Sequence, residues 1–185
     1  MRVIGNVVAY YSYQDYPSHH YLCKFKVKDV EFSSMEQMLM YSKAMLFQAE
    51  NIAKDIMATD VCQQQKMLGR RIPWSDDREA LWKSKRRKIA FIGNREKYRY
   101  NPPLLSLLMM TGESILVEAT RKDKIWGAGI DEDDDRIADP LQWKGENLHG
   151  EVQMEVRDYF RNHPEAKPLA DFAKAYNKDK QAGLI

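Results

Sequence analysis

The sequence is poor in cysteine and contains no apolar run that approaches the length of a membrane span. Only Cys23 and Cys62 occur among its 185 residues, which leaves no disulfide framework to build. A helix that crosses a bilayer needs roughly 20 consecutive apolar residues, and the start of the chain lacks the pattern of a secretory signal. These absences predict a cytoplasmic protein in a reducing compartment, without a membrane partner.

An excess of charge of one sign is missing as well. The 29 lysines and arginines nearly balance the 27 aspartates and glutamates, and the formal net charge is +2. Such a balance gives no strong global attraction to nucleic acid or to anionic membranes, although local contacts with phosphate remain open. The 44% of hydrophobic residues suffice for one substantial core. We expect one domain over residues 1–160 and a polar appendage over residues 161–185, in which residues 169–176 could form a short helix.

The nucleotide-binding and metal-binding motifs that are easiest to recognise are also absent. Neither a Gly-x-Gly-x-x-Gly fingerprint nor a P-loop occurs, which disfavours hydride transfer and ATP hydrolysis. The acidic run 131–135 begins like a calcium loop, but Arg136 stands where that loop requires glycine. The residues that could be imagined as a metal cluster are His19, His20, Cys23 and His149. Their spacing does not pair them as zinc ligands do, and we predict no metal and no cofactor.

Apolar periodicity predicts an α+β fold that is mainly helical and has a few short strands. Strands are predicted over residues 3–11, 21–27 and 114–120. Helices are predicted around Glu36 and over residues 48–57, 61–68, 76–92, 101–110 and 151–160. The interval 123–150 has little periodicity but contains several glycines and two tryptophans. Long irregular loops in compact domains are more often functional than accidental.

Glu36 and Lys43 lie seven residues apart in a stretch rich in Met, Leu, Phe and Tyr. In a helix, seven steps of about 100° return almost to the starting direction, so the two side chains would share one face, two turns apart. Met40 and Phe47 belong to the same side, which makes this face largely apolar. A charged pair there is unfavourable unless its members are paired or take part in chemistry.

A purely structural explanation competes with catalysis. Ser33 and Glu36 fit a capping box, in which the carboxylate only satisfies a backbone N–H, and Lys43 would extend to the surface. Ser34 and Gln37 form an equally good box, and that choice would leave Glu36 free. Taken alone, the pattern favours capping, and the choice between the boxes stays open.

The loop Trp126-Gly-Ala-Gly129 combines a flat aromatic ring with glycines that allow close approach of the backbone. Such a tryptophan can face a nucleobase or a sugar, although anchoring of the core is the commoner explanation. Basic residues that could receive a phosphate are Arg70, Arg71 and Lys85.

Five segments in a fixed order resemble the NADAR, or YbiA-like, family. They are Phe32-Ser-Ser-Met-Glu36 with Lys43, Leu116-Val-Glu-Ala-Thr120, Asp123-x-x-Trp126-Gly-x-Gly129, Pro140-x-x-Trp143-x-Gly-x-Asn147-x-x-Gly150 and Met154-x-Val156-Arg157. The resemblance covers about residues 10–160 and implies a compact, mainly helical α+β domain. It also implies hydrolysis of N-glycosidic bonds of ribose derivatives. The implied substrates are ribosylamino-pyrimidine phosphates of riboflavin biosynthesis or ADP-ribose linked to guanine, free or in DNA.

Two stretches depart from the family pattern. Pro17-Ser-His-His-Tyr21 replaces the usual Phe-Ser-Asn-Phe before the first helix, and His149 stands where an aliphatic residue is expected. These departures put the substrate contacts of the first stretch in question.

The resemblance and the residue chemistry together give a hypothesis for the site. An amine of lowered pKa can attack C1 of an opened ribose and form a Schiff base, which water hydrolyses with help from a carboxylate. We expect Lys43 to be this nucleophile and Glu36 the acid/base. The substrate-binding residues are expected to be Asp123, Trp126, Gly127, Gly129 and Asn147, although an Asx turn is the alternative for Asn147. A non-catalytic NAD or ADP-ribose-binding module is the alternative function, and it predicts binding without turnover.

Overall fold

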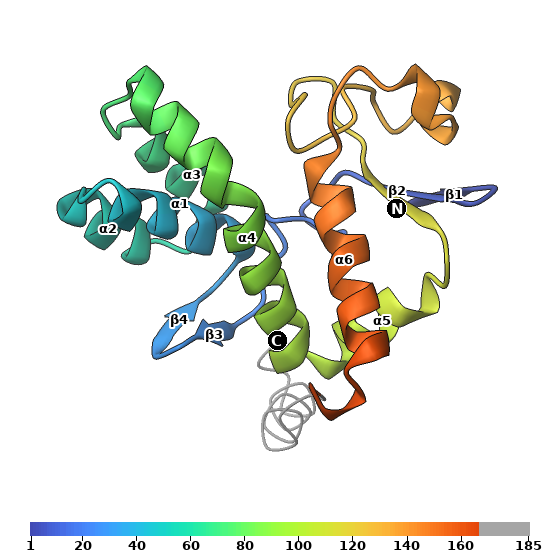
Figure 1. Cartoon of the computed structure of the whole chain (residues 1–185), viewed down its shortest axis with the longest axis horizontal. Helices are drawn as coiled ribbons and strands as arrows, with labels where there is room; N and C mark the ends of the chain where they lie inside the picture. The colour runs from blue at the N-terminus through green and yellow to red at the C-terminus, as the bar shows by residue number, and fades with distance from the viewer. Residues whose placement is uncertain (167–185) are drawn as a thin grey trace.

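Two small sheets and six α-helices make up the fold of the computed structural model, which describes residues 1–166 (Figure 1). The strands are β1 (Arg2–Ile4), β2 (Val7–Tyr10), β3 (Phe25–Val27), β4 (Val30–Phe32) and β5 (Ile115–Glu118). The helices are α1 (Met35–Leu46), α2 (Glu50–Met57), α3 (Cys62–Arg70), α4 (Asp76–Tyr100), α5 (Pro102–Met110) and α6 (Leu148–Asn162). Short 3-10 turns cover η1 (Asp135–Ala138), η2 (Pro140–Gln142) and η3 (Pro164–Ala166). The expected α+β, mainly helical fold is confirmed.

The larger sheet has the strand order β1-β2-β5. β1 and β2 form an antiparallel hairpin, while β2 and β5 run parallel, with Tyr10 beside Glu118. All four residues of β2 are buried, because both faces of the strand are covered. The register therefore brings Glu118, at the end of β5, to the junction where the chain leaves β2.

The long helix α4 crosses the centre of the molecule and separates two groups of elements (Figure 1). α1, α2 and α3 pack together on one side, and α6 packs on α4 and on β5 at the other side. The hairpin β3–β4 contacts α4 and leads directly into α1. A site formed between α1 and β5 therefore contains residues from both sides of α4.

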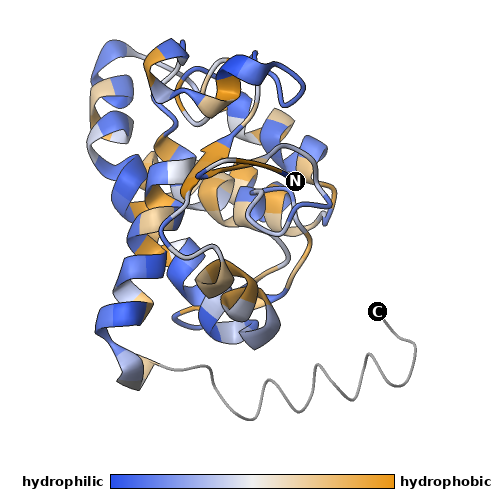
Figure 2. Cartoon of the chain, turned by 90° about the vertical axis from the view of Figure 1, so that its right-hand side faces the viewer, coloured by the Kyte–Doolittle hydropathy of each residue, from blue (hydrophilic) through white to orange (hydrophobic). Residues whose placement is uncertain are grey.

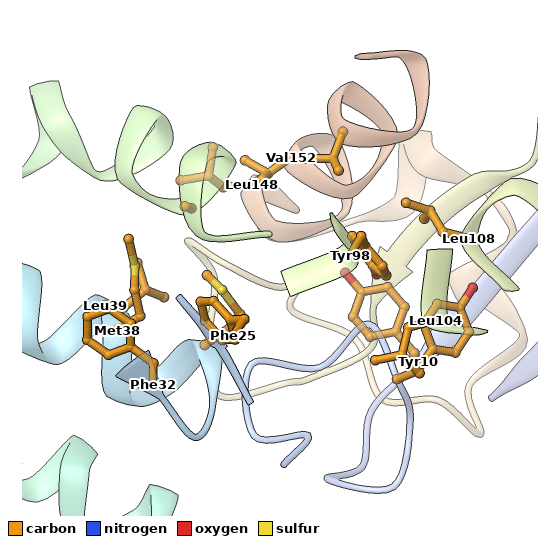
Figure 3. Packing of buried hydrophobic residues seen from close by; sticks show 14 of the residues in the cluster. Tyr10, Phe25, Phe32, Met38, Leu39, Tyr98, Leu104, Leu108, Leu148 and Val152 are labelled. Atoms are coloured by element: carbon orange, nitrogen blue, oxygen red, sulfur yellow. The ribbon is translucent and has the colours of Figure 1, made fainter. Parts of the chain in front are cut away.

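The main core runs from α1 across α4 to α6 (Figure 3). Phe32, Met38 and Leu39 lie at one end of it, and Tyr10 and Leu108 lie at the other. A second, smaller cluster packs on the opposite face of the larger sheet. Its buried members are Val7, Ala9, Val117, Ala119, Ala128, Ile130 and Ile137. Figure 2 shows the resulting division between hydrophobic interior segments and hydrophilic outer helix faces.

The largest departure from the predicted elements is the length of α4, which continues to Tyr100 instead of ending near residue 92. The residue after the predicted end is Gly93, and glycine has a low helix propensity. In the structure this glycine is the place where α4 meets α1, and a Cβ there would lie 2.7 Å from the Met35 methyl carbon. Because glycine has no side chain, the two helices can pack closely here. This packing outweighs the low helix propensity of glycine.

α6 also begins earlier than expected, at Leu148. Asn147 precedes it in a left-handed conformation with φ 50°, which asparagine tolerates better than most residues. The helix predicted over residues 169–176 lies outside the described residues. None of the described helices has the length and apolarity needed to cross a membrane.

Candidate active site

The start of α1 decides which capping box is used. Ser34 is the N-cap, and its Oγ accepts a hydrogen bond of 3.1 Å from the backbone N–H of Gln37. The Gln37 side chain returns to Ser33 and accepts from its backbone N–H at 2.8 Å. The Ser34–Gln37 alternative therefore describes the helix start, and the Glu36 side chain takes no part in capping.

Glu36 is buried, with 5% of its surface exposed. Its Oε1 atom has no hydrogen-bond partner, and its Oε2 atom lies 3.5 Å from Nε2 of His20. The backbone N–H of Glu36 also donates to the carbonyl oxygen of His19 at 2.9 Å, which joins the preceding loop to α1. A buried carboxylate with an unused oxygen is what acid/base catalysis on a bound substrate requires.

Lys43 follows two turns later on the same helix, and its amine is half-buried. Nζ donates a long hydrogen bond of 3.5 Å to the carbonyl oxygen of Gly69 and lies 4.1 Å from the ring centre of Trp74. Desolvation by burial lowers the pKa of Lys43, the charge of Glu36 opposes this shift, and the charge of Arg70 adds to it. A lowered pKa increases the fraction of neutral, nucleophilic amine near neutral pH.

Side chains from two helices donate hydrogen bonds to the loop before α1. Lys97 of α4 is completely buried, and its Nζ donates to the carbonyl oxygens of Tyr16 at 2.7 Å and Ser18 at 3.1 Å. Gln153 of α6 donates from Nε2 to the carbonyl oxygen of Pro17 at 3.0 Å. Three successive carbonyls are thus occupied, and the two histidines that follow are positioned at the site.

A group of imidazoles and carboxylates gathers where this loop meets β5 and α6. We call it the histidine–glutamate cluster, and its members are His19, His20, Glu36, Glu118 and His149. The rings of His19 and His149 lie 3.6 Å apart between centroids, tilted by 35°. Nδ1 of His149 lies 3.4 Å from Oε2 of Glu118. The described residues contain no group of three His, Cys, Asp or Glu arranged to hold a metal ion.

Burial and neighbouring charges set the protonation of this cluster. Desolvation lowers the pKa of His19 well below its usual value, and the positive charges around it, first that of His149, lower it further. Burial acts to raise the pKa of Glu118, but the contact with His149 and the charges of Lys66 and His20 bring it below its usual value. His19 is therefore neutral and Glu118 ionised near neutral pH.

The glycine-rich loop brings one of its predicted residues next to this cluster. Trp126 is half-buried, and its ring makes an edge contact with His19 at 5.2 Å between centroids. Gly127 lies against backbone, since a Cβ there would be 2.9 Å from the carbonyl oxygens of Asp123 and Glu118. Gly129 has a φ of +68°, which favours glycine. The two glycines shape the loop that carries Trp126.

Asp123 and Asn147 are engaged with the protein backbone. Oδ1 of Asp123 accepts from the N–H groups of Ile125 at 3.0 Å and Trp126 at 2.9 Å, as in an Asx turn. The Asn147 amide is buried and spans the end of β5, since it accepts from the Glu118 N–H at 3.0 Å and donates to the Leu116 carbonyl at 2.9 Å. Asn147 holds the strand, and Asp123 the loop, that surround the site.

Among the three basic candidates for a phosphate, Arg70 is the one whose charge acts on Lys43. Arg70, Arg71 and Lys85 are all exposed. Arg70 ends α3 next to Gly69, whose carbonyl oxygen accepts from Lys43. A phosphate bound by Arg70 would therefore lie on the same side of the site as the amine.

The model of the NADAR domain matches residues 9–161. This chain belongs to the NADAR family. Protein irg-1 of Caenorhabditis elegans is 34% identical over 142 residues, which cover 77% of this chain and 67% of that protein. N-glycosidase R617 of Acanthamoeba polyphaga mimivirus is 36% identical over 128 residues, which cover 69% of this chain and 74% of that protein.

The NADAR fold is also seen in a solved structure. The NMR structure of the Escherichia coli protein YbiA superimposes with a TM-score of 0.70, covering 91% of this chain and 93% of that chain at 22% identity. At this identity the likeness concerns the fold. It agrees with the compact, mainly helical domain expected from the ordered motifs.

Three residues of this NADAR domain's site were not selected from the sequence. His20 was considered only as a metal ligand, although it lies beside Glu36. Trp74 follows a helix stop and carries no motif, yet it contacts the Lys43 amine. Glu118 stands inside a quoted motif, and its approach to His149 needs the β2–β5 pairing to be known. Of these three residues, His20 had a signal in the sequence, because it lies in a stretch that departs from the family pattern.

Proposed function

We propose that this NADAR domain is an N-glycosidase that hydrolyses the C1–N bond of a ribosyl N-glycoside. Lys43 is the covalent nucleophile, and Glu36 is the acid/base. The observation that carries the proposal is the pairing on one helix face of an amine with lowered pKa and a buried carboxylate with an unused oxygen. The likeness to a protein named N-glycosidase R617 supports the same class of reaction.

The reaction can be written with these two side chains alone. Opening of the ribose ring breaks the C1–O4 bond, moves a proton from Glu36 to O4 and leaves C1 doubly bonded to the leaving nitrogen. The neutral amine of Lys43 adds to C1, Glu36 carries a proton from the new ammonium nitrogen to the leaving nitrogen, and the old C1–N bond breaks. The product of this step is a Schiff base between C1 and Lys43.

Water completes the cycle. It adds to C1 while the Glu36 carboxylate accepts its proton, and collapse of the adduct releases the sugar and restores the neutral amine. One water is consumed, and the C1–N bond is replaced by a C1–O bond. The desolvation that lowers the pKa of Lys43 favours the attack, because only the neutral amine carries the lone pair.

Two substrate classes fit the proposal. They are the ribosylamino-pyrimidine phosphates of riboflavin biosynthesis and ADP-ribose linked to guanine, free or in DNA. Both carry phosphate, for which exposed Arg70 near Lys43 is a candidate ligand. Trp126 is the candidate to face the base, since it is half-buried at the edge of the histidine–glutamate cluster.

Borohydride trapping tests the covalent route. The protein is incubated with each substrate in the presence of borohydride, and the reduced adduct is located by peptide mass spectrometry. We expect the sugar adduct on Lys43, together with irreversible loss of activity, and no adduct on a Lys43→Arg variant. Full turnover without a trapped adduct would reject the Schiff base.

Parallel turnover assays with ribosylamino-pyrimidine phosphate and with ADP-ribosylated guanine in DNA separate the two substrate classes. Glu36→Gln serves as the matched inactive variant, since it keeps the shape of the side chain. Binding of both substrates without turnover of either would contradict the enzymatic proposal. That result would favour the non-catalytic NAD or ADP-ribose-binding module.

A further inference from the structure

His20 is the most exposed member of the histidine–glutamate cluster, and it lies directly beside Glu36. Its side chain is 30% exposed, against 6% for that of Glu36. Nε2 of His20 lies 3.5 Å from Oε2 of Glu36, which is longer than a good hydrogen bond but common for catalytic pairs before substrate binds. The other carboxyl oxygen, Oε1, has no partner. The imidazole therefore distinguishes the two oxygens of this carboxyl.

The backbone of His20 is fixed on both sides, independently of Glu36. Its N–H donates to Oγ of Ser18 at 3.1 Å, and its carbonyl oxygen accepts from Sγ of Cys62, at the start of α3, at 3.6 Å. The carbonyl oxygen of Ser18 accepts in turn from the buried Lys97 of α4. Contacts to two helices thus hold the imidazole beside the carboxyl.

The proposed reaction uses Glu36 as an acid and as a base at the same carbon. The carboxyl gives a proton to O4 and later accepts one from the attacking water. Both transfers are direct only if the same oxygen faces the sugar in the acid form and in the carboxylate form. A carboxylic acid can carry its proton on either oxygen, so a neighbouring group has to make the two oxygens unequal.

An imidazole N–H that donates to one of the oxygens has this effect. A carboxylate oxygen accepts hydrogen bonds, and so does the unprotonated oxygen of a carboxylic acid. With the ring proton on Nε2, His20 can donate to Oε2 of Glu36 in both states, which leaves Oε1 to carry the exchangeable proton. We propose that His20 is a positioning residue that fixes Oε1 of Glu36 as the oxygen of proton transfer. This inference rests on the proposed function for its catalytic consequence.

The position of His20 in the sequence makes this role a property of the chain. The family pattern Phe-Ser-Asn-Phe, aligned on Ser18, has phenylalanine where this chain has His20. Phenylalanine has no N–H group to donate. The positioning of Glu36 by an imidazole therefore goes beyond what the shared motifs imply.

Four variants separate positioning from packing. His20→Gln keeps an N–H donor near the place of Nε2, while His20→Leu and His20→Phe keep bulk without a donor. The matched control is His163→Gln, which removes an exposed imidazole at the end of α6, whose Nδ1 lies 2.9 Å from the carbonyl oxygen of Tyr159. Melting temperatures show whether each variant is folded.

We expect His20→Leu and His20→Phe to lower kcat roughly 10- to 100-fold and to change KM by less than about threefold, because orientation of the acid/base is lost while substrate binding is kept. His20→Gln should restore most of kcat, since its amide donates to Oε2 in place of the ring. His163→Gln should behave like wild type. A purely structural role of His20 would not predict recovery by a donor.

NMR of the ring nitrogens tests the contact without turnover. In the neutral ring of 15N-labelled wild type, Nε2 of His20 should carry the proton, and its signal should move in Glu36→Gln. The signals of His163 should stay in place. The variants at positions 20 and 163 assign the two rings by loss of their signals.

The inference is overturned if His20→Leu keeps the kcat of wild type, if His20→Gln is as impaired as His20→Leu, or if the His20 signals ignore Glu36→Gln. The last criterion applies even where a variant at position 20 fails to fold. The proposed function fails separately, because a wild-type protein that turns over no N-glycoside would reject the glycosidase. The ring signals would then decide whether His20 positions the carboxyl of Glu36.

Discussion

The amine of Lys43 lies 4.1 Å from the centre of the Trp74 ring, in cation–π contact. Trp74 is 46% exposed, so the contact lies at the surface of the protein. A π face stabilises the ammonium but not the neutral amine, and it therefore acts against the desolvation that lowers the pKa of Lys43. The structure places these two opposing influences on a single nitrogen.

Replacement of Trp74 by leucine should move the acidic limb of the pH–rate profile to lower pH. Leucine keeps an apolar neighbour but removes the π face, so the ammonium loses about 0.5–1 kcal/mol of stabilisation. The shift should be about half a pH unit, because one pKa unit corresponds to about 1.4 kcal/mol. Trp74→Phe, which keeps a π face, is the control. An unchanged or upward-shifted limb in Trp74→Leu would contradict this role.

Substitution of Ser34 should affect stability, whereas substitution of Glu36 should affect catalysis. Ser34→Ala removes the N-cap of α1 and should lower the free energy of unfolding by about 1 kcal/mol. Glu36→Gln leaves the cap intact and keeps the size of a buried side chain whose Oε1 atom has no partner, so it should not destabilise the fold. Turnover should instead fall roughly 10²- to 10⁴-fold. Urea unfolding and turnover assays measure the two effects, and a destabilised Glu36→Gln would favour the structural role.

Lys97 should make stability rise with pH in the alkaline range. Burial lowers its pKa from 10.5 to about 8, so between these values the unfolded chain binds more protons than the folded one. The contribution of Lys97 to the free energy of unfolding is least favourable below pH 8. It increases as pH rises through the folded-state pKa, by about 2 kcal/mol at most up to pH 9.5. Urea midpoints of wild type should therefore rise relative to those of Lys97→Met. Parallel pH dependences of the two proteins would refute the assignment.

Gly150 should tolerate no side chain. A Cβ at this position would lie 2.0 Å from the carbonyl oxygen of Leu116 in β5. This oxygen belongs to the backbone of a strand, so it cannot rotate away as a flexible side chain can. Gly150→Ala should lower the free energy of unfolding by about 3 kcal/mol or more. Gly69→Ala is the comparison, because there the new Cβ would meet the Met40 sulfur, which a flexible side chain can move. Equal losses in the two variants would show that α6 can shift on β5.

Local signals predicted most of the elements. α5 begins at Pro102, within the segment expected from the Asn-Pro-Pro sequence, because proline suits the first helical turn. α1 was expected because Ser34 precedes an apolar run. The end of α4 was missed because Gly93 fills a helix crossing, and a crossing depends on a partner that the local sequence does not show.

The candidate site was predictable where its members share one helix. Glu36 and Lys43 are linked by helical periodicity alone, which the sequence displays. His19 and His149 come together only through the loop anchored on α4 and α6 and through the pairing of β2 with β5. No spacing rule connects residues so far apart in the chain, so their stacking required the tertiary structure.

The anchoring of the loop before α1 has a consequence for its motion. The carbonyl oxygens of Tyr16, Pro17 and Ser18 bind side chains of two different core helices. This segment can detach only when contacts to both helices break, so its local opening should require nearly the free energy of global unfolding. Its amide hydrogens should then exchange as slowly as those of α4. The wall that carries His19 and His20 would be rigid before substrate arrives and would not act as a moving lid.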